Sequence, residues 1–144
     1  MSKLKFLFFL SIAAFVSCGE PEEDMNQVDE FDIVGKWTFA SVSGSGQIFG
    51  VPQSDKDDNP VGYIEFYENG LGFSDFSIEL LSQTIAKQET IQWERMDLII
   101  DIEEEDGAHE IWTLINANES MIEADWFLDF GTGNQATVTM ELTR

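Results

Sequence analysis

The stretch that decides the fold is Tyr63-Ile-Glu-Phe-Tyr-Glu-Asn-Gly-Leu-Gly-Phe-Ser-Asp-Phe-Ser-Ile-Glu-Leu80. Near its start, Ile64 and Phe66 share one face, as a strand with one buried side requires. Asn69-Gly70 follows, and this pair is the strongest short hairpin signal because both positions of a two-residue turn need positive φ. The stretch is therefore predicted to be a β-hairpin.

The second half of this hairpin changes the parity of its apolar residues. Leu71 and Phe73 share one face, whereas Phe76, Ile78 and Leu80 share the other. An extra residue in one strand would bring both sets to the same side of the sheet. We therefore expect a β-bulge near Ser74-Asp75.

Similar alternation recurs along the chain beyond residue 34, where no stretch shows a convincing helical period. It predicts eight strands, joined mostly by short turns: 36–41, 63–68, 71–80, 90–94, 97–102, 110–115, 122–128 and 136–142. An antiparallel meander of this length loses its edge strands by closing on itself. We therefore predict an all-β fold, an eight-stranded antiparallel up-and-down barrel. A two-sheet sandwich is the alternative, and residues 83–87 are expected to form either one helical turn or a loop.

The composition excludes several classes of function. The 144 residues contain 7 Lys and Arg against 28 Asp and Glu, which gives a formal net charge of −21. Such a surface repels phosphate backbones and favours a monomer, so we expect no nucleic-acid partner. His109 is the only histidine, and no serine lies in a nucleophile-elbow motif. We expect no catalytic residue, cofactor or metal centre.

Two acidic segments leave weak calcium binding open. Asp55-Lys-Asp-Asp-Asn59 imitates the first half of an EF-hand loop. Pro60 stands where that loop needs glycine, and Phe66 stands where it needs glutamate. An irregular calcium site here or at 103–106 is one interpretation, and a solvated turn is the other.

The N-terminus has the order of a secretory signal peptide. Lys3 and Lys5 precede an apolar stretch, residues 6–16, and Ser17 then precedes Cys18, the only cysteine. The apolar stretch is shorter than the roughly 20 residues that a bilayer core of ~30 Å requires. The predicted organisation is a signal peptide at 1–17, a modified cysteine with an acidic disordered linker at 18–31, and a barrel domain at 32–144.

This N-terminus resembles that of bacterial lipoproteins. Phe15-Val-Ser-Cys18 is similar to the lipobox, whose cysteine becomes the acylated N-terminus. The resemblance implies fatty acyl chains such as palmitate on Cys18, and export to the bacterial outer membrane. The acidic run at 19–30 resembles a signal for the outer, cell-surface face of that membrane, and a simple spacer is the alternative.

The domain itself resembles the short lipocalin-like domains of bacterial lipoproteins. The resemblance covers residues 34–144 and rests on Val34-Gly35-Lys36-Trp37, Phe66-Tyr-Glu-Asn69-Gly70 and Leu142-Thr-Arg144. It implies that Gly35, Trp37 and Arg144 close the barrel, with the arginine stacked on the indole in a cation–π contact of ~0.5–2 kcal/mol.

The same resemblance implies a lid. Lipocalins place a long loop between their first two strands, and residues 44–62 form the one long connection here. Ile48, Phe49 and Val51 would be the apolar tip of this lid. A disordered loop is the alternative.

The implied function is a lipid-anchored protein that binds or carries a small hydrophobic ligand. Candidate wall residues are Phe39, Phe66, Phe76, Trp93, Trp112 and Trp126. These bulky side chains could also fill the barrel, which would leave a packed, non-catalytic interaction or structural module of the outer membrane. A cavity of a few hundred cubic ångströms would separate the two functions.

Overall fold

The structure is a computed structural model that describes residues 27–28 and 30–144. The predicted signal peptide and Cys18 lie outside the described residues, so both stay predictions. The described chain forms ten strands: β1 (Gln27–Val28), β2 (Gly35–Ile48), β3 (Val51–Asp57), β4 (Val61–Phe66), β5 (Leu71–Leu80), β6 (Gln83–Met96), β7 (Ile99–Glu103), β8 (His109–Asn118), β9 (Met121–Gly131) and β10 (Asn134–Thr143).

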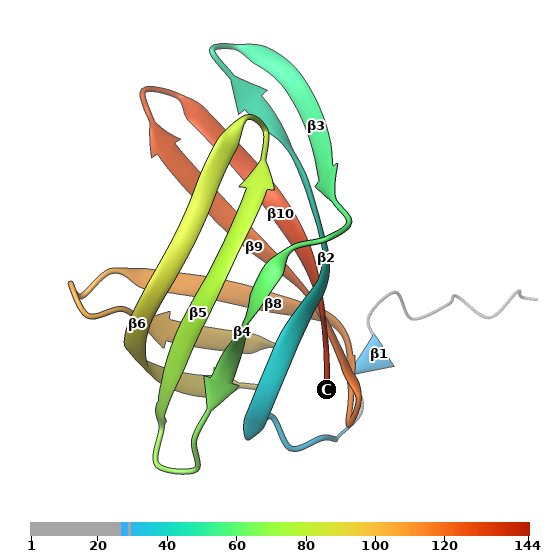
Figure 1. Ribbon diagram of the computed structural model, residues 1–144, viewed down its shortest axis with the longest axis vertical. Coiled ribbons are helices and arrows are strands. Elements are labelled where there is room, and N and C mark those ends of the chain that lie inside the picture. Colours follow the sequence, from blue (N-terminus) through green and yellow to red (C-terminus); the bar gives the residue numbers. More distant parts are fainter. Residues whose placement is uncertain (1–26, 29) are drawn as a thin grey trace, which may run out of the picture.

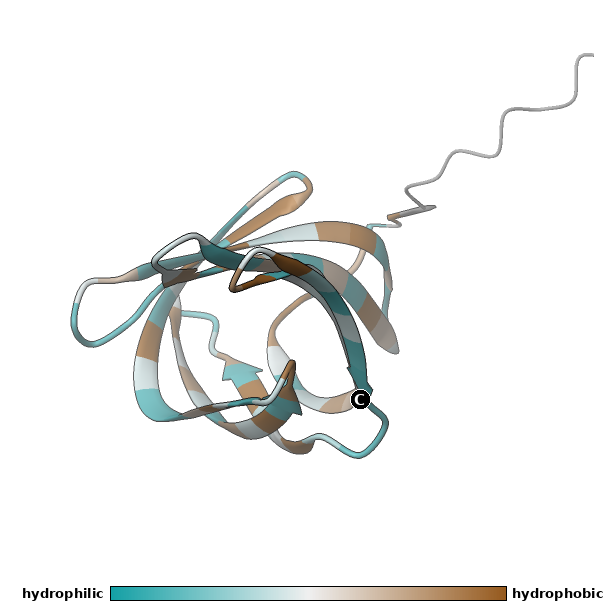
Figure 2. Ribbon diagram, turned by 90° about the horizontal axis from the view of Figure 1, so that it is seen from above, coloured by the Kyte–Doolittle hydropathy of each residue, from teal (hydrophilic) through white to brown (hydrophobic). Residues whose placement is uncertain are grey.

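Eight of these ten described strands close into one barrel. Their order is β8-β7-β6-β5-β4-β2-β10-β9, and β9 returns to pair with β8. Every ladder around this path is antiparallel, and the strands form a ring in the view from above (Figure 2). The predicted eight-stranded up-and-down barrel is confirmed, and the two-sheet sandwich is wrong.

The other two strands extend this wall. β1 pairs in parallel with β8 through Gln27↔Asn116 and Val28↔Ala117. β3 pairs with the second half of β2, while β4 pairs with the first residues of β2. Figure 1 shows β3 beside β2 at one end of the barrel and β4 lower down.

The β4–β5 hairpin forms as predicted, but its details differ. Both ladders of β5 keep a continuous register, so the predicted bulge is wrong. Gly72 and Ser74 take inward positions, while Leu71 and Phe73 face outward. A Cβ on Gly72 would lie 2.4 Å from the carbonyl oxygen of Glu65, which explains why the sequence pattern breaks at this inward position.

The turn of this hairpin is longer than a two-residue turn. The Gly70 amide donates to the carbonyl of Tyr67 (3.1 Å), and Gly70 alone of the Asn69-Gly70 pair has positive φ, 77°. The Asn69 side chain accepts a hydrogen bond from the Leu71 amide (3.0 Å). Asparagine thus stabilises the turn through its side chain.

Residues 83–87 are strand rather than helix or loop, so both alternatives for them were wrong. β6 pairs with β5 along its whole first half, from Leu80↔Gln83 to Phe73↔Thr90. A two-residue turn, Leu81-Ser82, joins the strands with φ of 54° and 61°. The strand identity of this polar segment comes from its neighbour, since β-propensity depends strongly on context.

The barrel has two different ends. At the closed end β2 begins and β10 ends. The tips of the β2–β3, β5–β6 and β9–β10 hairpins lie at the opposite, open end, and the β7–β8 tip projects from the side of the barrel (Figure 1). Fully buried side chains concentrate inside, among them Trp37, Phe66 and Trp112. Burial of each large apolar side chain contributes about 1.5–3 kcal/mol.

Candidate functional site

The closed end brings together the residues predicted to close the barrel. Trp37 is fully buried, and the guanidinium carbon of Arg144 lies 4.1 Å from the centroid of its ring. The guanidinium donates to the carbonyls of Val34 (3.2 Å) and Asp32. The Trp37 indole N–H donates to the carbonyl of Ile33 (2.8 Å). One arginine therefore joins the end of β10 to the segment that enters β2.

Gly35 supports this arrangement through its backbone. Its φ is +130°, which is accessible to glycine and strained for other residues. A Cβ there would meet the Arg144 guanidinium carbon at 3.9 Å, an ordinary contact. Backbone conformation, rather than space, therefore requires glycine before Lys36-Trp37.

The six candidate wall residues all face the inside of the barrel. Trp93 is half-buried, and the other five are buried. Five of the six rings, all but Trp126, form aromatic pairs, with centroids 4.9 Å apart for Phe39–Phe76, 5.1 Å for Phe66–Trp93 and 6.5 Å for Phe66–Trp112. Such separations are typical of favourable aromatic pairs in a core or in a pocket wall.

The predicted lid loop is a β-hairpin. β2 continues to Ile48 because its residues pair with β10 on one side and β3 on the other. Ile48 is buried, whereas Phe49 is 86% exposed and Val51 is 55% exposed at the hairpin tip. The Phe49 amide donates to the side chain of buried Asn134 (2.6 Å), which ties this tip to β10.

The acidic segment after Ser54 has a structural role. The carboxylate of Asp55 accepts a hydrogen bond from the Leu81 amide (2.9 Å), and that of Asp57 accepts one from the Glu79 amide (3.3 Å). These contacts join β3 to the end of β5 with side chains in place of a backbone ladder. Among the described residues, no group of three or more His, Cys, Asp or Glu is arranged to hold a metal ion.

A charged cluster formed by β6, β8 and the turn between β7 and β8 was missed in the sequence. The Lys87 ammonium contacts the carboxylates of Glu104 and Glu110, and the three side chains are only 15%, 17% and 7% exposed. The ammonium also lies 5.6 Å from the centroid of Trp126. The available signal was parity: Lys87 shares the inward face of β6 with Ile91, and Glu110 shares that of β8 with Trp112.

The cluster shifts the ionisation of its members. Burial, which disfavours the charged carboxylate, raises the pKa of Glu110 to about 7, even though Lys87 opposes the shift. Burial alone would lower the pKa of Lys87, but hydrogen bonds to Glu104 and Glu110 outweigh it and raise that pKa. The cluster therefore takes up or releases a proton near neutral pH while Lys87 stays charged.

Next to this cluster lies a buried donor without a partner. The indole N–H of Trp112 has no hydrogen-bond acceptor within the described part of the chain. In contrast, the indole N–H groups of Trp37 and Trp93 donate to the carbonyls of Ile33 and Leu71, each at 2.8 Å. An unsatisfied buried donor is rare and costs about 1–3 kcal/mol.

One side of the open end lacks a continuous wall. β6 pairs with β7 only over Gln92–Met96, and β9 pairs with β8 only up to Trp126. Within residues 30–144, no ladder joins the first half of β6 to the last residues of β9. We call this region, residues 83–88 and 127–131, the open side. Inward-facing Ile85, Leu128 and Phe130 pack against the core there but stay partly exposed.

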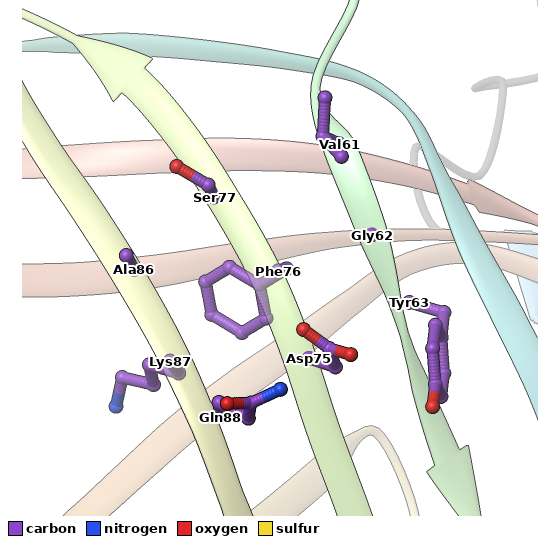
Figure 3. A pocket seen from close by; sticks show the side chains of 9 residues that line it. All are labelled: Val61, Gly62, Tyr63, Asp75, Phe76, Ser77, Ala86, Lys87 and Gln88. Atoms are coloured by element: carbon purple, nitrogen blue, oxygen red, sulfur yellow. The ribbon is translucent and has the colours of Figure 1, made fainter.

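A separate hollow of about 470 Å³ lies on the outer wall over β4, β5 and β6 (Figure 3). Six of its nine lining residues alternate with inward-facing ones and so face outward: Val61, Tyr63, Asp75, Ser77, Ala86 and Gln88. Because of this position, the hollow is not the interior cavity that ligand carriage would require.

Among the residues that the structure describes, no helix is long and apolar enough to cross a membrane. No protein-family model and no curated protein matches the chain.

The solved structures that are similar to it include the following two. One is aphrodisin, a sex pheromone from female hamster, at 11% identity over 78% of this chain and 75% of that chain, with a TM-score of 0.45. The other is a deswapped triple mutant of bovine odorant binding protein, at 11% identity over 76% of this chain and 72% of that chain, with a TM-score of 0.44. Similarity at this level carries no argument about function.

Proposed function

We propose that this protein is a monomeric, lipid-anchored, lipocalin-like barrel of the bacterial cell envelope, and that it binds a small apolar molecule at the open end. The observation that carries this proposal is the partial exposure of Ile85, Leu128 and Phe130 on an inward face. Deeper positions on the same barrel interior, such as Trp112, are fully buried. The open side therefore offers apolar surface that a ligand would cover.

Covering this apolar surface with a ligand would contribute binding free energy in proportion to the area removed from water, at about 25 cal/mol per Å². Aromatic rings below the open side would contact the inner end of a ligand. Trp126 is two residues before Leu128 on the same face of β9, and Phe76 lies across the barrel on β5. Both are apolar contacts that neither make nor break a bond of the ligand, so the proposed role is binding rather than catalysis.

Lipid anchoring through Cys18 is the second part of the proposal. It is supported by the lipobox resemblance and by the position of β1, which pairs with Asn116 and Ala117 of β8. Those residues lie near the closed end, where β8 finishes. A tether that enters there leaves the open end free to exchange ligand, and the acidic run at 19–30 supports a location on the outer face of the outer membrane.

A packed interaction module is the second candidate function. The close pairs Phe39–Phe76 and Phe66–Trp93 favour it, because both fill the interior. In that case the exposed tip at Phe49 would be a contact for another envelope protein.

Native mass spectrometry of the mature protein, purified gently from its host, separates the two functions. A small molecule that co-purifies and is lost on unfolding is the result expected for a carrier. A bare mass, with no change in tryptophan fluorescence when N-phenyl-1-naphthylamine is added, would instead favour the interaction module.

A matched pair of variants locates the binding region. Ile85→Glu places a charge on the open side and should abolish probe binding. Ile111→Glu places the same charge on the outer face of β8, where Ile111 is 44% exposed, and should leave binding intact. Equal effects of both variants would contradict binding at the open side.

The anchor is tested with the full chain in its host. An alkyne analogue of palmitate should label the wild-type protein, whereas Cys18→Ser should remove the label. Persistent labelling of the variant would rule out Cys18 as the anchor.

A further inference from the structure

We propose that the barrel selects uncharged apolar molecules with a hydrogen-bond acceptor, such as long-chain ketones, alcohols or esters, and discriminates against fatty-acid anions. The inference rests on the proposed function, since it specifies the ligand class of the same site. It is carried by two neighbouring features of the interior: the unpartnered donor of Trp112 and the cluster of Lys87, Glu104 and Glu110.

The donor defines what the ligand must offer. Trp112 is fully buried in β8, and its indole N–H has no acceptor among the described residues. Its ring packs edge-on to Phe66, with centroids 6.5 Å apart, so one side of the indole is covered by an apolar ring. A ligand oxygen that accepts this hydrogen bond would remove the penalty of a buried, unsatisfied N–H. A pure hydrocarbon has no hydrogen-bond acceptor and would leave this N–H unpaired.

The cluster lies beside that donor. Glu110 is two residues before Trp112 on the inward face of β8. Trp112 pairs directly with Trp126 across the β8–β9 ladder, and the Lys87 ammonium lies 5.6 Å from the Trp126 ring. Trp112 thus adjoins Glu110 along β8 and pairs with Trp126, which lies beside Lys87, so we expect a polar group bound at its N–H to lie near the cluster.

The charges of the cluster define what the ligand must avoid. One ammonium faces two carboxylates, so the fully ionised cluster carries a net charge of −1. Lys87 already contacts both carboxylates, so its ammonium is poorly placed to pair with a third carboxylate from a ligand. A fatty-acid carboxylate would meet like charge in a site where poor solvation strengthens repulsion. An uncharged oxygen meets no such repulsion.

Glu89 adds to this discrimination. It shares the inward face of β6 with Lys87, and its carboxylate accepts a hydrogen bond from the Glu105 amide (3.3 Å). Arg95, on the same strand, is occupied at the closed end by the carbonyls of Phe31 and Asp97 (3.1 Å each). Glu89 therefore adds negative charge on this face of β6, and Arg95 supplies no free positive charge beside Trp112.

The test uses mature wild-type protein and four probes of equal chain length: undecan-2-one, undecan-1-ol, undecane and undecanoate. Each probe displaces N-phenyl-1-naphthylamine at mildly alkaline pH. We expect the ketone and the alcohol to bind about fivefold more tightly than undecane, which is the ratio that one net hydrogen bond supplies. We expect undecanoate to bind about tenfold or more weakly than the ketone.

Variants then separate the two features. Trp112→Phe should remove the preference for the ketone over undecane while undecane still binds. Glu104→Gln should strengthen undecanoate binding relative to the ketone, because Lys87 then faces a single carboxylate. Glu105→Gln is the matched control: it changes net charge equally, but its carboxylate contacts the Thr90 amide (3.1 Å) instead of Lys87.

The outcomes are distinguishable without any variant. Equal affinities for the ketone, undecane and undecanoate would overturn the inference and leave the proposed function in place. Tight binding of undecanoate alone would overturn it as well. Failure of all four probes, undecane included, would overturn the proposed function and the inference together.

Discussion

Arg144 lies over Trp37, with its guanidinium carbon 4.1 Å from the centroid of the indole ring. The arginine follows β10 and the tryptophan is near the start of β2, so the contact spans the seam between the last and first strands of the barrel. The same guanidinium donates to the carbonyls of Asp32 and Val34. One side chain thus covers the indole and satisfies backbone acceptors of the segment before β2.

Replacing Arg144 should destabilise the closed end. Because Arg144→Ala removes the cation–π contact and two hydrogen bonds, we expect the free energy of unfolding to fall by about 1–2 kcal/mol. Arg144→Lys keeps the charge but cannot reach both carbonyls with a planar fork, so it should lose part of that amount. Urea-induced unfolding followed by tryptophan fluorescence measures both. Lys56→Ala, which removes an exposed pair with Asp58, serves as the control, and an equal loss in it would contradict the assignment.

The pH dependence of stability should carry the signature of Glu110. Burial raises its pKa to about 7 in the folded protein, against an ordinary value of 4.5. Between these values the folded state holds a proton that the unfolded state has released. The contribution of Glu110 to the free energy of unfolding is therefore complete below pH 4.5 and is lost as the pH rises through about 7.

Substitution isolates this effect from the general charge of the chain. Glu110→Gln should flatten the fall in stability between about pH 5 and about pH 8, measured by urea unfolding at fixed ionic strength. Glu141→Gln removes an equal charge from an exposed position of β10 and should keep the wild-type slope. A slope unchanged in Glu110→Gln would mean that its proton is not linked to folding.

Much of the barrel could be predicted from alternation, but segments with small inward residues could not. Residues 43–46 of β2, Ser-Gly-Ser-Gly, have the composition of a loop. They are strand because they pair with β10 and β3, and glycine is required where neighbours come too close for side chains: a Cβ on Gly44 would lie 2.4 Å from Leu80, and one on Gly46 would lie 2.1 Å from the carbonyl of Gln135. Glycine here reports close packing, which a single sequence does not distinguish from flexibility.

The same limit applies to the candidate site. The six inward aromatic residues follow from strand parity alone. The contact between Lys87 and Glu110 depends on which strands pair and in what register, because 23 residues separate them in sequence. The missing partner of Trp112 is likewise a property of the packed interior. Parity predicted the inward direction of these six aromatic side chains, whereas the ladders decided which inward side chains meet.

The join between β3 and β5 should depend on two carboxylates. Because Asp55→Ala removes the acceptor of the Leu81 amide, we expect the free energy of unfolding to fall by about 1 kcal/mol. Asp58→Ala, an exposed neighbour paired with Lys56, should change it far less. Thermal unfolding in the presence and absence of millimolar calcium extends the test. Since Asp55 and Asp57 already accept backbone hydrogen bonds, we expect no rise in Tm, and a clear rise would support the calcium site instead.

The tip of the β2–β3 hairpin should gain stability when Phe49 is replaced. Phe49 has a φ of 54° and is 86% exposed, so the folded protein bears the strain of a bulky residue in the left-handed region without burying its ring. Asparagine tolerates this conformation much better. We expect Phe49→Asn to raise the free energy of unfolding by up to about 1 kcal/mol, measured by urea unfolding.

The control is Phe127→Asn, at an exposed strand position outside the positive-φ region, which should lower the free energy of unfolding. If Phe49→Asn is neutral or destabilising, the ring contributes contacts at the open end, and a parallel loss of probe binding would identify the tip as part of the ligand site.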